Sequence, residues 1–507
     1  MGNSENNKRI AKNTVLLYIR MLVLMLIGLY TSRVILNALG VQDYGIYNVV
    51  GGFVAMFALI SGTLSSSISR FLTFELGRGD FYQVKKVFST GLTLQLGLCI
   101  VVILLGETIG LWFLNAKIQI PNGRYNAAFW VYQLSILTFC LNLISVPYNA
   151  TIIAHEKMTA FAYIGIIEGC LKLLIAFAIT ISPFDKLISY SILMALVALI
   201  VRSVYTIYCQ KTFNESKYNW TIDKGLFKEM FIFAGWNFIG SSSSVLMGQG
   251  VNILMNMFFG IIPNAARGIA TTVENIVNQF ANSFVTAISP QITKSYASHD
   301  LSYMHSLVFK GSKFSFYLVF ILALPLLLET ESLLSIWLGK VPEYTISFIR
   351  LTISISLLSV LSNTLVTSIL ATGNTRNYQI IVGGLGLLIF PLAYISYLAG
   401  FSPEFSYIIQ FIIFVFQLGV RLYLLKQMIS LSIIQFMHEV LFYVFIVLLT
   451  ASILPVMAHV IIQDSTLRFI IVVLLCILSS CMSIYFLGFT RVEREVVAAK
   501  VLSYIKR

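Results

Sequence analysis

Long apolar runs separated by short polar segments dominate this chain of 507 residues. The runs are about 20 to 25 residues long, enough to cross a hydrocarbon core of ~30 Å at 1.5 Å per residue of helix. The pattern predicts about 14 membrane-spanning helices joined by short loops. The predicted spans are residues 14–39, 46–69, 87–114, 127–153, 160–181, 187–209, 229–258, 265–290, 309–335, 346–371, 379–400, 404–427, 440–461 and 467–489.

Composition leads to the same fold class. Hydrophobic residues make up 58% of the chain, charged residues make up 11%, and the mean hydropathy is +0.87. A water-soluble protein of this size needs a charged fraction of roughly 25%. Soluble enzymes, secreted domains and nucleic-acid binders are therefore excluded, and the sequence predicts an all-α integral membrane protein without a nucleic-acid partner.

The net charge of +13 reports on topology. Lys and Arg accumulate on the cytoplasmic side of membrane spans. If the N-terminus is inside, roughly 24 of the 34 basic residues fall on the inner side, against about eight outside. This bias predicts a multi-pass protein with an even number of spans and both termini in the cytoplasm.

An internal repeat relates the two halves of the chain. Gly40–Asp80 aligns without a gap with Gly260–Asp300, at an offset of 220 residues. Six predicted spans separate the copies, and an even number preserves orientation, so the halves are expected to be parallel repeats around a midplane cavity. The predicted domains are an N-terminal six-helix bundle (1–212), its repeat (213–430) and two additional helices with a basic tail (431–507).

Polar residues recur every three or four positions in the seventh and eighth predicted spans, and so form one stripe on each helix. A stripe of this kind indicates either a water-accessible cavity, which we favour, or contacts between helices through Asn, Ser and Thr. We select Arg267, Asn252 and Asn278 as candidate substrate-binding residues and Glu274 as a candidate ion-coupling residue. The stripes are Asn237, Ser241, Gly248, Asn252 and Asn256 in one span and Arg267, Thr271, Glu274, Asn275, Asn278, Asn282 and Thr286 in the other.

Charged residues also occur inside the first and fifth spans. Glu168 and Lys172 lie one helical turn apart. They are either a pair that serves only packing or functional groups, with Glu168 coupling an ion and Lys172 binding substrate. Arg20 is a candidate cavity residue, whereas Arg33 either binds substrate or extends to the outer headgroups. On a straight helix these arginines point roughly 140° apart, so sharing one cleft needs a bend near Gly28.

A family resemblance adds to these predictions of fold and site residues. The stretch TSRVILNALGVQDYGIYNVVGGFVAMF, followed by SSSISRFLTFELGRGD, resembles the opening of bacterial Wzx-type polysaccharide flippases. These belong to the multidrug/oligosaccharidyl-lipid/polysaccharide exporter (MOP) superfamily. The resemblance is most specific over residues 10–90 and extends to the whole chain as a span pattern. It implies a transporter of the bacterial inner membrane, not an enzyme, that exports undecaprenyl-diphosphate-linked oligosaccharides to the outer leaflet.

The resemblance further implies contacts with membrane lipid and with other polysaccharide-assembly proteins. A cationic cavity suits a diphosphate, because Arg and Lys donors replace its water shell. No cofactor or metal site is predicted, although the two glutamates are candidates for Na⁺ or H⁺ coupling. The alternatives are a multidrug or metabolite exporter of the same superfamily and a flippase for peptidoglycan lipid II. A membrane-embedded enzyme ranks last, because the longest outer loop, near Asn115–Asn126, is short.

Overall fold

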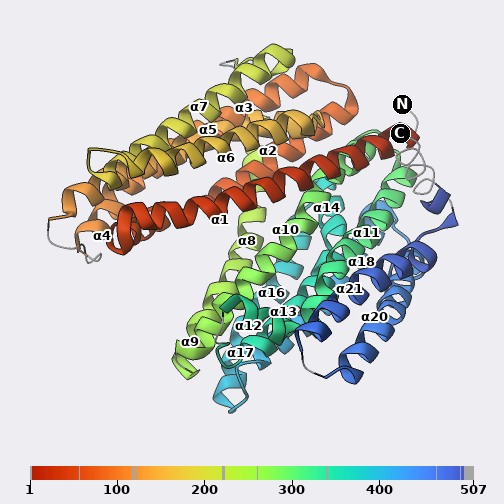
Figure 1. Ribbon diagram of the computed structural model, residues 1–507. Helices are drawn as coiled ribbons and strands as arrows, with labels where there is room; N and C mark the ends of the chain where they lie inside the picture. Colours follow the sequence, from red (N-terminus) through yellow and green to blue (C-terminus); the bar gives the residue numbers. More distant parts are fainter. Residues whose placement is uncertain are drawn as a thin grey trace, which may run out of the picture. The chain divides into compact units, whose positions relative to one another are not determined.

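The computed structural model describes residues 3–55, 57–116, 120, 123–219, 223–259, 261–338, 341–463, 465–491 and 493–495. These residues form helices and no strand. They divide into two compact helical units, coloured red to yellow-green and green to blue in Figure 1. Unit 1 comprises Met1–Ser241 and Thr293–Asp300, and unit 2 comprises Ser242–Ile292 and Leu301–Arg507. The predicted domain boundaries at residues 212 and 430 stay a prediction.

Unit 1 is built mainly from six long helices. In it α5 packs against α1, α2, α3 and α7, and α1 packs along α6. Its elements are α1 (Asn3–Ala55), α2 (Ala58–Arg78), α3 (Phe81–Leu105), η1 (Gly106–Gly110), α4 (Leu111–Ala116), α5 (Tyr125–Ala154), α6 (Met158–Thr180), α7 (Lys186–Thr212), η2 (Asn214–Ser216) and most of α8 (Lys224–Val245).

Unit 2 is organised around α11, which packs against α13, α14, α20 and α21. Its elements are η3 (Leu246–Gly250), α9 (Val251–Phe259), most of α10 (Ile261–Ala297), α11 (Leu301–Leu328), α12 (Thr330–Leu338), α13 (Thr345–Val360), α14 (Asn363–Thr372), α15 (Arg376–Tyr378), η4 (Gln379–Gly383), α16 (Gly384–Leu387), α17 (Ile389–Leu398), α18 (Phe405–Ile429), α19 (Ile433–Phe436), η5 (Met437–Phe442), α20 (Tyr443–Ile461), α21 (Thr466–Ser483) and η6 (Ile484–Gly488).

The helices confirm the predicted fold class of an all-α membrane protein. Among the described residues, nine helices are long and apolar enough to cross a membrane. A tenth span is formed by α13 and α14 together, which are bent by 41° at a short break. These ten coincide with ten of the predicted spans. The other four predicted spans are also helical and fall on α1–α2 and on α8–α10.

The first two predicted spans are not separated by a loop. Both begin in one helix, α1, which is interrupted at Gly40 (φ 77°, ψ 167°). A glycine reaches this backbone conformation without steric cost because it lacks a Cβ. Gly28 was the suggested position for a bend that would let Arg20 and Arg33 share a cleft, whereas the residue with non-helical backbone angles in the described α1 is Gly40.

The internal repeat is visible in the way its two copies end. The Gly79 amide donates to the Leu76 carbonyl, and the Asp80 amide donates to the Glu75 carbonyl. Each of these bonds recurs 220 residues later, from His299 to Tyr296 and from Asp300 to Ser295. Even the left-handed residue is kept, with φ 77° at Gly79 and 60° at His299. The two segments therefore share helix ending and backbone geometry as well as sequence.

The last turn of α10 packs closely on α2 within unit 1. A Cβ at Gly77 would lie 2.8 Å from the Ala297 Cβ and 2.8 Å from the Lys294 Cα. Residues 77 and 297 are equivalent positions of the repeat. This contact depends on the absence of a side chain at Gly77.

We predict that Gly77→Ala destabilises the protein by about 1–3 kcal/mol, because backbone atoms of α10 must move to admit the methyl group. Gly62 is the matched control, since a Cβ there meets nothing within 4 Å. Gly62→Ala should leave the protein as stable or slightly more so, because alanine favours helix. Thermal unfolding in detergent micelles measures both. Equal melting temperatures for the two variants would contradict the tight contact.

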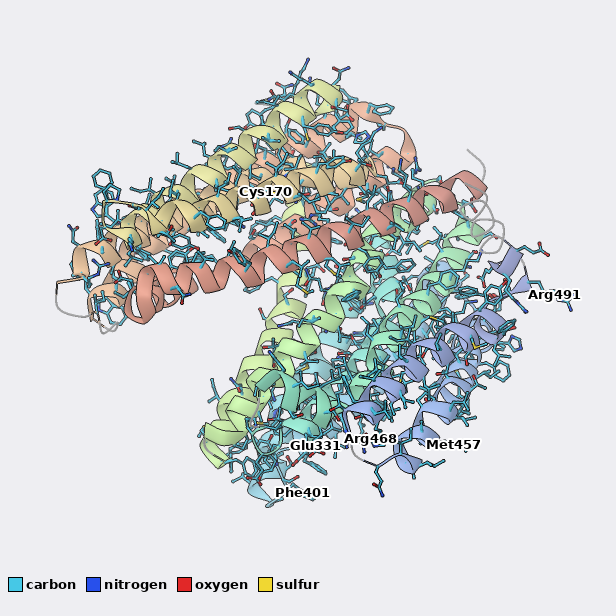
Figure 2. All side chains as sticks on the ribbon, in the orientation of Figure 1. Cys170, Glu331, Phe401, Met457, Arg468 and Arg491 are labelled. Atoms are coloured by element: carbon cyan, nitrogen blue, oxygen red, sulfur yellow. The ribbon has the colours of Figure 1, made fainter. Side chains whose placement is uncertain are left out.

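One ion-pair cluster and one single ion pair join the α11 region to the C-terminal part of the chain. At the end of α11, the buried Glu329 carboxylate lies 2.9 Å from His459 Nδ1 of α20 and 3.2 Å from Arg468 Nε of α21. Arg468 is labelled in Figure 2 near this end of unit 2. Sixteen residues earlier, about 24 Å along the helix axis, Lys313 Nζ lies 3.1 Å from Glu493 Oε2. Both anchors on α11 have nearly or fully buried side chains.

We predict that Glu329→Ala loosens α20 and α21 from unit 2, because it leaves the largely buried Arg468 without its carboxylate. Removing one partner of a buried ion pair costs on the order of 3–5 kcal/mol. The expected result is faster hydrogen exchange along α20 and α21 and a lower melting temperature. Glu331→Ala is the control, since that side chain is exposed two residues away. Unchanged exchange in the Glu329 variant would show that the apolar contacts alone hold these helices.

Candidate functional site

A polar cavity of about 400 Å³ lies within unit 2. It is lined by residues of η3, α9, α10, α13 and α18. It contains three of the predicted site residues, Arg267, Asn252 and Glu274. The residues that line it are Met247, Gly248, Asn252, Arg267, Gly268, Thr271, Glu274, Thr352, Ile355, Tyr407 and Gln410.

Arg267 is held by groups from two other elements. Its Nη2 donates a hydrogen bond of 3.1 Å to the Gly248 carbonyl, which lies in the π-helical turn η3. Its Cζ lies 5.4 Å from the ring centre of Tyr407 on α18. A guanidinium has five N–H donors, so most of them stay available to a ligand. The cavity therefore presents a cation whose orientation is fixed by the surrounding helices.

The carboxylate of Glu274 accompanies this cation. Glu274 interacts electrostatically with Arg267 and forms a hydrogen bond with Asn278, one turn further along α10. Asn278 itself is not among the residues that line the cavity. The spacing of 267, 271, 274 and 278 places these side chains on one face of α10. The cavity thus has both a cationic and an anionic side chain.

The predicted residues of unit 1 form a separate cluster. Lys172 Nζ and Glu168 Oε1 are 2.6 Å apart on α6, with both side chains more than one-third exposed. The Arg20 guanidinium lies 4.1 Å above the ring of Phe161 on the same helix and interacts electrostatically with Glu168 and with Tyr205 of α7. Arg20 therefore points toward α6, and it does not line the cavity in unit 2.

One predicted residue cannot be placed. Arg33 belongs to α1, but its side chain lies outside the described part of the chain, as does that of Asn256 on α9. The structure therefore groups Arg267, Glu274 and Asn252 in one place and Arg20, Glu168 and Lys172 in another. Their assignment to substrate binding and ion coupling stays a prediction.

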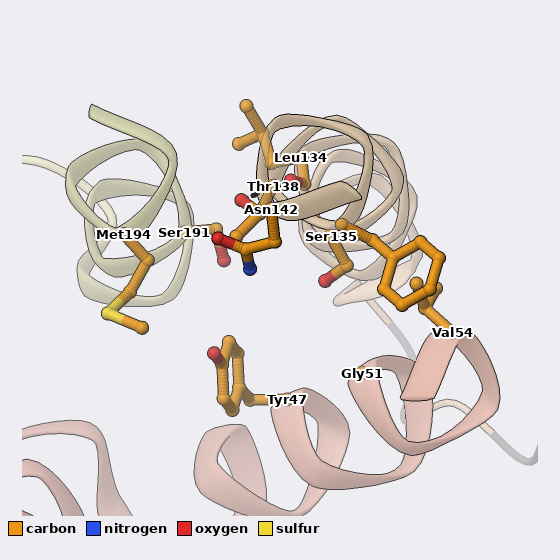
Figure 3. Close-up of a pocket in the computed structure, with 10 residues that line it drawn as sticks. Tyr47, Gly51, Val54, Leu134, Ser135, Thr138, Asn142, Ser191 and Met194 are labelled. Atoms are coloured by element: carbon orange, nitrogen blue, oxygen red, sulfur yellow. Dashed lines mark hydrogen bonds between the residues drawn. The ribbon is translucent and has the colours of Figure 1, made fainter. Parts of the chain in front are cut away.

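A second, smaller cavity was not predicted from the sequence. It has a volume of about 170 Å³ and lies within unit 1, between the later part of α1 and helices α5 and α7 (Figure 3). Its lining is neutral, with small hydroxyl and amide side chains beside the ring of Tyr47. The lining residues are Tyr47, Gly51, Val54, Leu134, Ser135, Thr138, Phe139, Asn142, Ser191 and Met194.

The two cavities occupy equivalent places in the two copies of the repeat. Adding 220 to 47, 51 and 54 gives Arg267, Thr271 and Glu274, all of which line the cavity in unit 2. Adding 217 to 135 and 138 of α5 gives 352 and 355 of α13. Adding 216 to 191 and 194 of α7 gives 407 and 410 of α18. One scaffold therefore carries a neutral cavity in unit 1 and a charged cavity in unit 2.

Comparison with known proteins identifies the fold. No family model matches the chain, and no curated protein matches it. Solved structures of MATE transporters are similar to it. One, a point mutant of a MATE transporter, has a TM-score of 0.73 at 12% identity, covering 84% of this chain and 96% of that one. Another, described as an outward-facing multidrug-resistance MATE transporter of the MOP superfamily, has a TM-score of 0.70 at 13% identity with the same coverage.

A third similar structure is a MOP superfamily transporter from Pyrococcus furiosus, with a TM-score of 0.70, 12% identity and coverage of 84% of this chain and 96% of that one. It is described as having a binding pocket of reverse polarity that suggests a different function. At these identities the similarity establishes the fold. The chain is thus a multi-pass membrane protein with the fold of MOP superfamily transporters.

The position of Arg20 generates a prediction. A Cβ at Gly165 would lie 2.3 Å from the Arg20 Nε. Gly165→Ala should therefore displace the guanidinium from α6 while the backbone stays in place, because a flexible side-chain end can move. If Arg20 binds substrate from this position, Gly165→Ala and Arg20→Ala should lower transport in proteoliposomes to a similar degree.

Gly28→Ala is the control, since no atom lies within 4 Å of a Cβ there. It should transport like the unmodified protein. Loss of transport in Arg20→Ala combined with full transport in Gly165→Ala would show that the contact with α6 is not what makes Arg20 important.

Proposed function

We propose that this protein is an alternating-access flippase. Its substrate is an undecaprenyl-diphosphate-linked oligosaccharide, moved from the inner to the outer leaflet of a bacterial inner membrane for surface polysaccharide assembly. The fold supports a transporter of the MOP superfamily, and the sequence of residues 10–90 supports the polysaccharide branch. The observation that carries the proposal is the exposure of the Arg267 guanidinium in the cavity of unit 2.

An arginine suits the diphosphate of such a lipid. A phosphate cannot leave water for hydrocarbon without replacement of its hydrogen bonds. The planar guanidinium can donate two parallel hydrogen bonds to phosphate oxygens. The contact between Arg267 and the Gly248 carbonyl orients the group before the substrate arrives, which lowers the entropy cost of binding. The neighbouring Asn252 adds an amide for further polar contacts.

The membrane potential favours export of this cargo. A diphosphate carries about two negative charges, and the cytoplasm is negative. Moving one elementary charge across the membrane is worth about 2.3 kcal/mol per 100 mV, so outward movement of two gains on the order of 4–5 kcal/mol. Glu274 would add coupling to Na⁺ or H⁺ if it takes up a cation when substrate leaves Arg267.

Glu274 also favours a second candidate function. A carboxylate in an intramembrane cavity is the group that attracts cationic drugs or metabolites, and it lies beside the cavity's arginine. On this hypothesis Arg267 serves to orient Glu274 and the protein is a multidrug or metabolite exporter. The two functions differ in which of the two charged residues contacts the substrate.

Charge-preserving and charge-removing variants separate the two functions. For a flippase, Arg267→Ala should lower translocation of an undecaprenyl-diphosphate disaccharide in proteoliposomes at least about tenfold, the loss of one charge-assisted contact. Arg267→Lys should retain part of the activity, since it keeps the charge but loses the bidentate geometry. The Glu274→Gln variant should still bind the lipid, although the dependence of translocation on an ion gradient changes.

For a cation exporter, the substitution at Glu274 should have a larger effect than the substitution at Arg267. Glu274→Gln should abolish efflux of tetraphenylphosphonium in the same vesicles, while Arg267→Ala has the smaller effect. Melting temperatures of the variants show whether each is folded. Unimpaired lipid translocation by Arg267→Ala would refute the proposed role of this residue and with it the support for the flippase.

A further inference from the structure

The neutral cavity of unit 1 offers no cationic side chain to an anionic group. None of the ten residues that line it is charged. Its volume of about 170 Å³ is comparable with that of a single monosaccharide and far below that of a polyprenyl chain. This cavity occupies the position in the repeat that corresponds to the charged cavity of unit 2. Equivalent helices therefore line a neutral cavity in unit 1 and a charged one in unit 2.

An aromatic ring forms one wall of this cavity. Tyr47 faces the opening in Figure 3, opposite Asn142 and Ser191. Its ring is held by an edge-to-face contact with the buried Tyr190 of α7, with 4.7 Å between ring centres. Gly51, one turn along α1, also lines the cavity. Because it has no side chain, it leaves the space beside this ring open. Tyr47 therefore presents a fixed apolar surface to a small ligand.

The opposite wall offers both hydrogen-bond donors and acceptors. In the part of the chain that the structure describes, the Asn142 amide and the Ser135 hydroxyl form no hydrogen bond, so the amide keeps two donors and an acceptor. The hydroxyls of Thr138 and Ser191 donate to the carbonyls of Leu134 and Leu187, at 2.7 and 3.1 Å. Their oxygens are therefore left as acceptors.

This set of groups selects among ligands by charge. A phosphate or carboxylate accepts hydrogen bonds and would face the acceptor oxygens of Thr138 and Ser191 without a compensating cation. A cationic drug would find no carboxylate among the lining residues. A neutral sugar fits both walls, because each hydroxyl is donor and acceptor at once, while the C–H face of the ring is apolar and packs on an aromatic side chain.

We propose that the cavity lined by Tyr47, Ser135, Thr138, Asn142 and Ser191 binds one neutral sugar ring of the transported molecule. This inference rests on the proposed function, since it takes the cargo to carry sugars. Tyr47 supplies the stacking surface, Asn142 supplies donors and an acceptor to neighbouring hydroxyls, and Thr138 and Ser191 accept from the remaining hydroxyls. The charged cavity of unit 2 holds the diphosphate in this scheme.

The test measures saccharide binding and lipid binding separately on the full chain in lipid nanodiscs. The saccharide probes are neutral disaccharides of hexose and N-acetylhexosamine units, and the lipid probe is undecaprenyl diphosphate without sugar. Asn142→Leu and Tyr47→Leu should each weaken binding of the preferred disaccharide about tenfold, as expected for the loss of one well-placed contact. Both should bind undecaprenyl diphosphate as the unmodified protein does.

Three control variants accompany these. Tyr47→Phe keeps the ring and should bind the disaccharide within about twofold of the unmodified protein. Ser203→Ala removes an exposed hydroxyl of α7 outside the cavity and should change nothing. Arg267→Ala should lose undecaprenyl diphosphate but keep the disaccharide.

The outcomes distinguish the two proposals. Disaccharide binding that is absent from the unmodified protein, or that survives in both Asn142→Leu and Tyr47→Leu, overturns the sugar subsite. So does a result in which these variants lose tetraphenylphosphonium and keep the disaccharide, because the cavity would then be a drug site. If the disaccharide binds as expected but undecaprenyl diphosphate is not bound, the sugar subsite stands and the proposed flippase fails.

Discussion

The cost of a charge inside an apolar membrane protein governs the arrangement of unit 2. A charged side chain within a membrane span is costly unless it meets water or a partner. Arg267 meets the Gly248 carbonyl, the ring of Tyr407 and the carboxylate of Glu274. Two of these three come from other elements, η3 and α18. These contacts stabilise the charge when η3, α18 and α10 lie together, which is the arrangement that lines the cavity.

The π-helical turn η3 provides the backbone acceptor. A π turn widens the helix by one residue and commonly marks a functional site. In η3 it brings the carbonyl of Gly248 within 3.1 Å of Arg267 Nη2. The guanidinium of Arg267 is thus held in part by a main-chain carbonyl, and a substitution that restored regular α-helix here would move this acceptor without changing any charged residue.

Much of the fold follows from local features of the sequence, whereas the sites follow only in part. Span lengths and the repeat are properties of short stretches of sequence. Ten spans, and the equivalence of the segments that end at Gly79 and His299, could therefore be predicted from the sequence. Arg267 and Glu274 were found because charges in apolar runs are rare and costly. The cavity around Tyr47 was not predicted, because tyrosine and serine are common in membrane spans and carry no comparable free-energy cost of burial. The break at Gly40 falls directly after the first predicted span, which ends at residue 39, but its backbone angles were not predicted, since a glycine in a helix gives no sign of its φ.

A duplicated scaffold explains why one cavity is charged and its counterpart is neutral. Each added intramembrane arginine needs its own set of partners, which unit 2 supplies through η3, α18 and Glu274. The equivalent positions in unit 1 hold Tyr47, Gly51 and Val54, which need none. On the proposed function, the charged copy contacts the diphosphate and the neutral copy recognises the uncharged part of the cargo, where hydrogen bonds lost to a wrong substrate give specificity.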